Sequence, residues 1–293
     1  NYDAGNRYRK KSATLNTVGN VYYANRCPQT VSYDMFKNPI TITEATRGKV
    51  DFEYNLSNSR SKSVVTTEAG TIAKTKYYSG VTAVEVIERP NQSLQFITYI
   101  AGSPYDAAVA LEKTYTNSGG NYTPSTEEYL YLHRDYQGTI LAISGNGGTI
   151  KERRQFDPWG NLKKYYKNNV EVSPTTFNNV DFELLTDRGY TAHEHFFSVG
   201  IIHMNARLYD PVLHTFLSPD ALISDPSNPQ NYNRYAYALN NPLMYVDYDG
   251  NEPITAAVLI TAAIIGAVIG GVTYVGLSLY NGTAITWGGL TKS

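Results

Sequence analysis

The sequence of 293 residues predicts a mostly β protein, in which an antiparallel sheet winds onward through about the first 180 residues. Turn-forming phrases recur along this part, and Asp34 and Asn55 lie 21 positions apart. Asp135 and Asp157 lie 22 apart, a period that fits two strands and two turns per unit. Between the turns apolar and polar residues alternate, as in residues 139–144, which is the period of a strand. No stretch before residue 180 has the periodicity of a helix.

The composition limits the possible partners and chemistry. Hydrophobic residues make up 42% of the chain, which is enough for a large core. The net charge of −1 argues against a nucleic-acid partner, because binding a polyanion needs a basic surface. The single cysteine, Cys27, excludes an internal disulfide and a zinc site built from cysteines. The chain opens on Asn1 with no signal-like segment after it, so we expect a fragment or a processed product.

Residues 187–250 are dense in turn formers and tyrosines, and they separate the predicted sheet from an apolar end. Within them, residues 231–239 predict a short helix. Asn231 can cap this helix, and Tyr235 and Leu239 fall on one of its faces. The helix would position the aspartate-containing turns on either side of it.

The recurring aromatic and aspartate turn phrases resemble the YD repeats of the RHS family, and residues 187–250 are similar to its repeat-associated core domain. The likeness to the core domain is the more specific one, because several short motifs follow one another in the family's order. Together the likenesses cover about residues 1–250. The motifs are Tyr2–Arg7, Tyr33–Asn38, Tyr54–Arg60, Arg134–Gly138 and Phe156–Asn161 among the repeats, and Gly189–His195, Met204–Pro211, Phe216–Asp220 and Asn240–Asp247 in the core domain.

The resemblance implies a β-strand ribbon that spirals into a hollow shell, as in bacterial polymorphic toxins and toxin-complex C components. It divides the chain into a YD-repeat shell segment (1–180), a core domain that closes the shell as a plug (181–250) and a hydrophobic pre-toxin or membrane segment (251–293). We therefore expect the C-terminal shell and core of a secreted or cell-surface bacterial toxin. This part would encapsulate and present its own C-terminal cargo, with secretion or delivery machinery as a further partner.

A second function stays open from the same resemblance. It extends to the YD-repeat teneurins of animals, which allows a cell-surface adhesion or carbohydrate-contacting protein. Exposed aromatic side chains on the outer face would favour adhesion, whereas an apolar or cargo-filled interior would favour encapsulation.

The aspartates near the end of the core carry the predicted chemistry. RHS cores that resemble this one often act as aspartyl autoproteases, which free the C-terminal segment just after a second Asp-Pro-x-Gly motif. Eighteen residues separate the two motifs, and the same spacing lies here between residues 225–228 and 247–250. The motif itself departs from the family's, because Asn228 replaces the first glycine and Tyr248 replaces the second proline.

Such chemistry needs two carboxyl groups that share a proton, so that one activates water while the other acts as the acid. Residues 232–239, midway between the motifs, contain no acid. The alternative is that these aspartates only form turns and caps. The candidate catalytic residues are Asp220, Asp225, Asp247 and Asp249, with Arg207 or Arg234 to polarise a carbonyl or hold a carboxylate, and the cleavage region is Gly250, Asn251 and Glu252.

Other constellations predict little chemistry. His193, His195 and His203 could be read as a zinc cluster, but the favoured interpretation is structural, with the histidines hydrogen-bonded to backbone. The sequence has no Gly-x-Ser-x-Gly elbow. The glycines of residues 145–148 join two alternating runs, as in a hairpin turn rather than a phosphate loop. We therefore predict neither a metal nor a cofactor.

The last segment is apolar, with no charged residue from Pro253 to Thr291. Ile254 to Tyr280 is 27 residues long, more than the roughly 20 that a membrane-spanning helix needs. Three interpretations stay open for this predicted helix. It could be a membrane anchor, a segment that helps deliver a C-terminal effector, or a helix buried in the shell. Thirteen residues follow it, too few for a toxin domain.

Overall fold

The protein is described by a computed structural model over residues 2–3, 6–14, 16–18, 29–57, 59–79, 83–90, 93–173, 182–220, 223, 225–251 and 253–255. These residues form a mostly antiparallel β structure with a few short 3-10 helices. The fold class predicted from the alternation of polar and apolar residues is therefore confirmed at this level. Cys27 lies outside the described residues.

Within the described ranges, fourteen strands form one continuous sheet, in which each strand pairs antiparallel with the next one along the chain. We call it the large sheet. Its strands are β3 (Ser12–Ala13), β4 (Gln29–Tyr33), β5 (Pro39–Glu44), β6 (Gly48–Tyr54), β7 (Arg60–Thr67), β8 (Ile72–Tyr78), β9 (Val84–Glu88), β10 (Leu94–Ile100), β11 (Val109–Ser118), β12 (Asn121–Arg134), β13 (Ile140–Ser144), β14 (Ile150–Phe156), β15 (Leu162–Lys167) and β16 (Val170–Val172).

The other described strands form small antiparallel sheets, in which β1 pairs with β2, β17 to β20 follow one another, and β21 pairs with β22. Residues 182–251 are called the terminal unit below. The strands are β1 (Tyr2–Asp3), β2 (Asn6–Lys10), β17 (Glu194–Phe196), β18 (Ile201–Met204), β19 (Arg207–Asp210), β20 (Thr215–Phe216), β21 (Tyr245–Asp247) and β22 (Pro253–Thr255), and the 3-10 helices are η1 (Asn146–Gly148), η3 (Tyr190–Ala192), η4 (Phe197–Val199), η5 (Pro229–Tyr232) and η6 (Ala238–Asn240).

The recurring phrases of the sequence form one kind of tight turn between strands. The Asp135 carboxylate accepts hydrogen bonds from the amides of Gln137 and Thr139, both at 2.9 Å. Gly138 has a φ of 81°, a left-handed conformation that glycine adopts without strain. The Asp157 carboxylate accepts hydrogen bonds from the amides of Trp159 and Asn161 in the same way, at 3.0 and 2.9 Å. The aspartate thus satisfies the turn amides and fixes where each strand ends.

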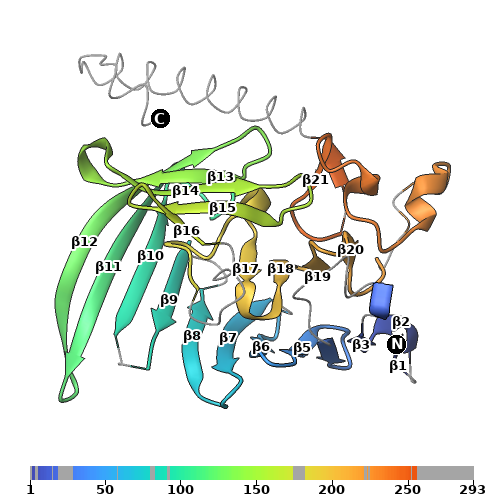
Figure 1. Ribbon diagram of the computed structural model, residues 1–293, viewed down its shortest axis with the longest axis horizontal. Coiled ribbons are helices and arrows are strands. Elements are labelled where there is room, and N and C mark those ends of the chain that lie inside the picture. The colour runs from blue at the N-terminus through green and yellow to red at the C-terminus, as the bar shows by residue number, and fades with distance from the viewer. Residues whose placement is uncertain are drawn as a thin grey trace.

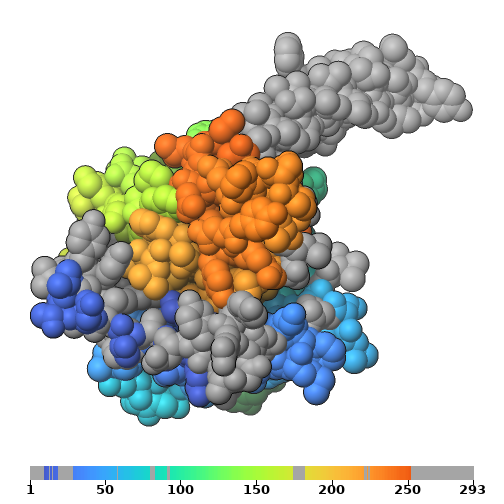
Figure 2. Space-filling view, turned by 90° about the vertical axis from the view of Figure 1, so that its right-hand side faces the viewer, coloured from blue at the N-terminus to red at the C-terminus, as the bar shows by residue number. Residues whose placement is uncertain are grey.

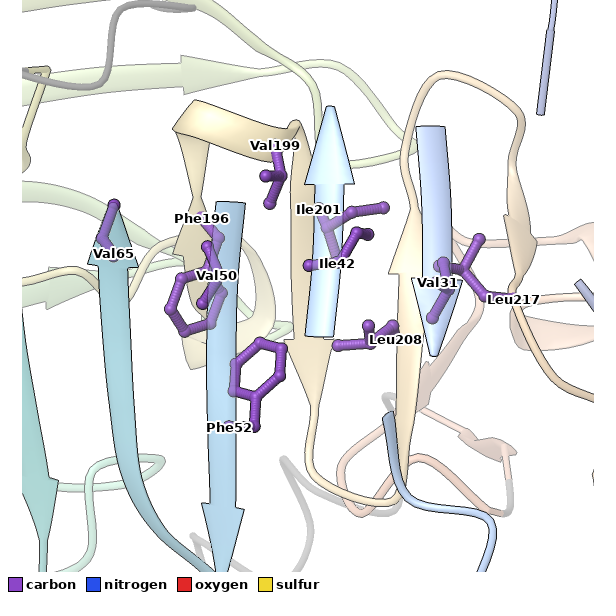
Figure 3. Packing of buried hydrophobic residues seen from close by; sticks show 10 residues of the cluster. All are labelled: Val31, Ile42, Val50, Phe52, Val65, Phe196, Val199, Ile201, Leu208 and Leu217. Atoms are coloured by element: carbon purple, nitrogen blue, oxygen red, sulfur yellow. The ribbon is translucent and has the colours of Figure 1, made fainter. Parts of the chain in front are cut away.

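The large sheet curves around β17 to β20, as Figure 1 shows, so that β5 to β8 lie on one side of them and β13 to β15 on the other. On the first side, apolar residues of β4 to β7 pack against the terminal unit (Figure 3). Phe52 of β6 meets Phe196 of β17 edge to face, with ring centroids 5.2 Å apart. Ile42 and Val50 are completely buried in this cluster. Burial of this apolar surface holds the sheet and the terminal unit together.

The opposite side of the curved sheet contacts the terminal unit through aromatic residues. Tyr190, Tyr209 and Tyr237 form a buried cluster, against which Phe156 and Trp159 of the β14 to β15 hairpin pack. In Figure 2 the orange residues of the terminal unit lie beside the yellow-green residues of the large sheet and above its blue residues. The terminal unit therefore fills this end of the curved sheet.

A cluster of buried charges also joins the two parts. The Lys76 ammonium of β8 lies 2.8 Å from Glu194 of β17 and 2.9 Å from Glu85 of β9. Lys74 lies 2.8 Å from Asp187. All five residues are buried, so the carboxylates of Glu194 and Asp187 depend on cations from a distant part of the chain.

The predicted helix over residues 231–239 is wrong. The structure instead has the short helices η5 and η6, and a turn between them that contacts β20 through an isolated bridge. The amide of Phe216 donates to the Tyr235 carbonyl at 2.9 Å, and Ala236 forms an antiparallel bridge with Thr215. These tertiary backbone hydrogen bonds replace the helical ones that the local pattern favoured.

The predicted apolar helix over residues 254–280 lies largely outside the described residues. Its first two residues, Ile254 and Thr255, belong to strand β22 and pair with β21. Among the helices that the structure describes, none combines the length and the apolar character that crossing a membrane requires.

Candidate active site

The predicted cleavage region lies in the loop of a β-hairpin. Strand β21 ends at Asp247, which pairs with Pro253 at the start of β22, so residues 248–251 belong to the connecting loop. Glu252, the last residue of the predicted cleavage region, lies outside the described residues. The amide of Gly250 donates to the Asp247 carboxylate at 2.8 Å. Gly250 has a φ of 77°, and a Cβ at this position would lie 1.9 Å from the Met204 carbonyl oxygen. Only glycine fits there, so the loop is pressed directly against the end of β18.

Arg207 is the first residue of β19, and it binds Asp220, Asp247 and the hairpin loop. Its Nη2 atom lies 3.1 Å from a carboxylate oxygen of Asp220 and 3.1 Å from one of Asp247. Its Nε atom donates to the carbonyl oxygen of Gly250, and Nη2 lies 3.4 Å from the carbonyl oxygen of Asn251. The guanidinium thus connects two candidate catalytic carboxylates to the two carbonyl groups at which a cut is predicted.

Sequence reasoning missed the aromatic ring that packs against the Arg207 guanidinium. The Arg207 guanidinium carbon lies 3.7 Å from the centre of the Phe216 ring, in a cation–π contact. Because Phe216 is buried in β20, this contact fixes the plane of the guanidinium. The position of Phe216 in the phrase Phe216–Asp220 was the available signal, since Asp220 follows it by four residues.

Asp247 and Asp249 lie in contrasting surroundings. The Asp247 side chain is buried, whereas Asp249 is exposed. Burial raises the pKa of Asp247 to about 7; Arg207 opposes this, and the charge of Asp249 and its hydrogen bond to Asp247 raise the pKa further. The buried Asp247 therefore keeps a proton up to near neutral pH beside the exposed Asp249. Two carboxyl groups in such different surroundings can take the separate roles of acid and base.

The structure places Asp225 outside this group. Its carboxylate accepts hydrogen bonds from the amide and the hydroxyl of Ser227, at 2.9 and 2.6 Å, on an exposed turn. These hydrogen bonds lower the pKa of Asp225. Arg234, the other candidate cation, lies beside the group, because its Nε atom donates to the backbone carbonyl of Asp220 at 2.8 Å.

A cavity of about 1080 Å³ borders the group. Arg207, Asp220, Asp249 and Asn251 contribute to its wall, together with residues of the large sheet such as Arg60. The exposed Asp249 therefore faces a space that can admit water.

The three histidines that the sequence singled out, His193, His195 and His203, are all buried. The ring of His193 hydrogen-bonds to the Tyr248 carbonyl at 3.0 Å, and the ring of His195 accepts from the Tyr190 amide at 3.0 Å. Burial lowers the pKa of both histidines to about 3, so both are neutral. Within the described ranges, no group of three His, Cys, Asp or Glu side chains could hold a metal ion.

Comparison with known proteins finds relatives that match only part of this chain. No family model matches the chain. The tRNA3(Ser)-specific nuclease WapA of Bacillus spizizenii is 32% identical over 148 residues, which are 50% of this chain and 6% of the relative. Salivary gland surface protein 1 of Aedes aegypti is 27% identical over 143 residues, which are 49% of this chain and 4% of that protein. The chain thus spans a small part of the relatives that it matches.

A solved structure shares the fold. The crystal structure of TcdB2-TccC3-Cdc42 superimposes with a TM-score of 0.58 and 15% sequence identity, and the match covers 76% of this chain and 10% of that chain. The β architecture of this chain is therefore also found in a much larger toxin-complex chain. At this level of identity the likeness concerns the fold alone.

Proposed function

We propose that this chain is the C-terminal shell and core of a secreted RHS-type toxin, which encloses and presents a C-terminal cargo and frees it by aspartyl autoproteolysis. The observation that carries the proposal is the position of Arg207, Asp247 and Asp249. Arg207 and Asp247 lie against the described loop residues 248–251, which include Asp249, directly before the apolar segment.

The enclosing role is supported by the curved sheet and by the relatives. The terminal unit lies at one end of the large sheet and contacts both of its sides, as a plug would. The WapA relative is named as a tRNA nuclease, and the similar fold comes from a structure of TcdB2-TccC3. Both support a toxin that is longer than this chain, released from a bacterium or held at its surface.

The proposed cut is hydrolysis of the Gly250–Asn251 peptide bond. Arg207 withdraws electron density from the Gly250 carbonyl through its Nε donor. Ionised Asp249 takes a proton from water as the water oxygen bonds to the carbonyl carbon. Protonated Asp247 gives its proton to the leaving nitrogen of Asn251 as the C–N bond breaks. The products are a new carboxylate on Gly250 and a new amino group on Asn251, and the cut consumes one water molecule.

Intact-mass measurement of the purified protein over time tests this proposal. We expect the full-length mass to be replaced by two masses, of residues 1–250 and 251–293, with Asn251 as the first residue of the released fragment. Protein kept in concentrated urea from the start is the control, because the group forms only in the folded chain. An unchanged mass in the folded protein over several days would contradict autoproteolysis.

The apolar residues 254–280 follow the proposed cut, so they would leave with the cargo. Their composition suits a segment that contacts a membrane during delivery of a downstream effector. The same segment could instead serve as a membrane anchor or be stored inside the shell. Either role would end when the Gly250–Asn251 bond is cut.

Adhesion is the second candidate function, and a specific observation favours it. Tyr77 of β8 and Tyr129 and Tyr131 of β12 are between 41% and 44% exposed, on strands of the large sheet. One relative is named as a surface protein. Exposed tyrosines suit contacts with carbohydrate or with another protein. A chain whose mass does not change would leave this function as the better supported one.

A further inference from the structure

The peptide group between Tyr248 and Asp249 lies between the two aspartates of the proposed pair. Asp247 precedes Tyr248 and Asp249 follows it, so the orientation of the peptide group between Tyr248 and Asp249 affects how closely the two carboxyl groups approach. In a fully extended strand, residues two apart are separated by about 6.6 Å along the chain. In the hairpin, Asp249 raises the pKa of Asp247 through its charge and through a side-chain hydrogen bond.

Two side chains donate to the Tyr248 carbonyl oxygen. The Nδ2 atom of Asn205 lies 2.8 Å from this oxygen, and the Nε2 atom of His193 lies 3.0 Å from it. A carbonyl oxygen only accepts, so Nε2 of His193 carries the proton. Nδ1 of His193 then accepts from the Thr191 hydroxyl, at 2.8 Å. Both acceptor positions of the carbonyl are filled, which fixes the direction in which it points.

Tyr105, in the loop between β10 and β11, fixes Asn205 from the large sheet. Its hydroxyl donates to Oδ1 of Asn205 at 2.8 Å, so Nδ2 is the atom that faces Tyr248. The Tyr105 ring also packs edge to face against the rings of His193 and Tyr248, with centroids 5.3 and 5.8 Å away. The hold on Tyr248 therefore depends on docking of the terminal unit against the large sheet.

The backbone around Asn205 holds the rest of the loop. The amide of Ala206 donates to the Asp249 carbonyl at 3.0 Å, and Met204 is the residue against which Gly250 is pressed. Asn205 itself has a φ of 58°, a left-handed conformation that asparagine tolerates better than most residues. Residues 248–250 are thus pinned at successive carbonyl groups by one turn.

We propose that Tyr105, His193 and Asn205 are positioning residues for the aspartate pair. They bind the Tyr248 carbonyl and thereby hold the carboxyl groups of Asp247 and Asp249 in contact. This inference rests on the proposed autoproteolysis, in which the two carboxyl groups exchange protons with water and the leaving nitrogen. None of the three residues belongs to the proposed scissile bond, so their effect passes through Tyr248.

Other charged and titratable groups also face Asp247, and they stay in place when the three positioning residues are changed. Arg207 pairs with it directly, and Asp220 and Arg234 line a small pocket together with Asp247. The Tyr237 hydroxyl is a further titratable group close to it. A change in Asp247 that follows mutation of Asn205 would therefore report the approach of Asp249.

The test combines a titration with a cleavage assay on the full chain. The variants are Asn205→Ala and the milder Tyr105→Phe, which removes only the hydroxyl group. Tyr136→Phe is the matched control, because the Tyr136 hydroxyl also donates to a backbone carbonyl of the terminal unit, that of Leu243 at 2.9 Å. Carbon-13 NMR follows the Asp247 carboxyl group with pH, and intact mass follows cleavage.

We expect Asn205→Ala to lower the titration midpoint of Asp247 by about one pH unit and to slow cleavage by about 100-fold, as for a misplacement of about 1 Å. Tyr105→Phe should lower the Asp247 midpoint and the cleavage rate by smaller amounts. Tyr136→Phe should leave the midpoint and the rate unchanged. Midpoints and rates equal to wild type in both test variants would overturn the inference. If the wild-type chain is never cleaved, autoproteolysis fails, and the NMR midpoints alone still decide whether these residues hold the pair.

Discussion

Asp247→Asn is expected to slow release of the C-terminal fragment by about 100-fold to 10,000-fold, the contribution typical of a positioned acid or base. The asparagine keeps the size of the side chain and can still contact Arg207, so the loop should stay in place. It cannot give a proton to the leaving nitrogen. Intact mass at fixed intervals, at a pH near 6, measures the two rates.

The matched control for this variant is Asp225→Asn. Asp225 belongs to the spacing motif that the sequence indicates, but its carboxylate caps an exposed turn. We expect its replacement to leave the cleavage rate within about two-fold of wild type, which is well below the effect of removing an acid or base. Equal loss of cleavage in both variants would show that the spacing motif, rather than the group around Arg207, carries the chemistry.

Lys76→Met is expected to lower the free energy of unfolding by about 3–5 kcal/mol, as for a buried ion pair that loses one partner. The Lys76 ammonium is 1% exposed and lies 2.8 Å from Glu194, 2.9 Å from Glu85 and 3.4 Å from Asp187. Methionine fills a similar volume but leaves three buried carboxylates with one cation fewer. Equilibrium unfolding in urea, followed by circular dichroism, measures the change.

Lys49→Met is the control for this second variant. The Lys49 ammonium lies 2.8 Å from Asp51, but the two side chains are 45% and 33% exposed. An exposed ion pair of this kind contributes about 0–1 kcal/mol, so the control should stay close to wild type. Similar losses in the two variants would mean that the buried charges do not hold the terminal unit against the large sheet.

The β fold could be predicted from the sequence because its signals are local. Alternation within a strand and an aspartate that caps its own turn both depend on neighbouring residues, as at Asp135 and Asp157. The helix predicted over residues 231–239 failed for the complementary reason. Its capping asparagine and spaced tyrosine are also compatible with turns, and pairing with β20 decided the outcome.

The residues of the candidate site could be predicted from the sequence, but their arrangement in space could not. Arg207, Asp220, Asp247 and Asp249 were all named from the sequence, and the structure brings them together. Asp225 was named with them because a spacing motif reports distance along the chain and not its path in space. His193 and Asn205 were missed as contacts of the loop, because each meets Tyr248 only after the terminal unit has folded.

The dependence of the cleavage rate on pH tests the proposed acid and base roles of Asp247 and Asp249. Below a pH of about 7, Asp247 holds its proton and can act as the acid beside Asp249. As the pH rises through about 7, this proton is lost and both carboxyl groups are ionised. We therefore expect a cleavage rate that is highest on the acidic side of neutrality and falls as the pH rises through about 7. A rate that instead rises through neutrality and stays high in alkaline solution would contradict it.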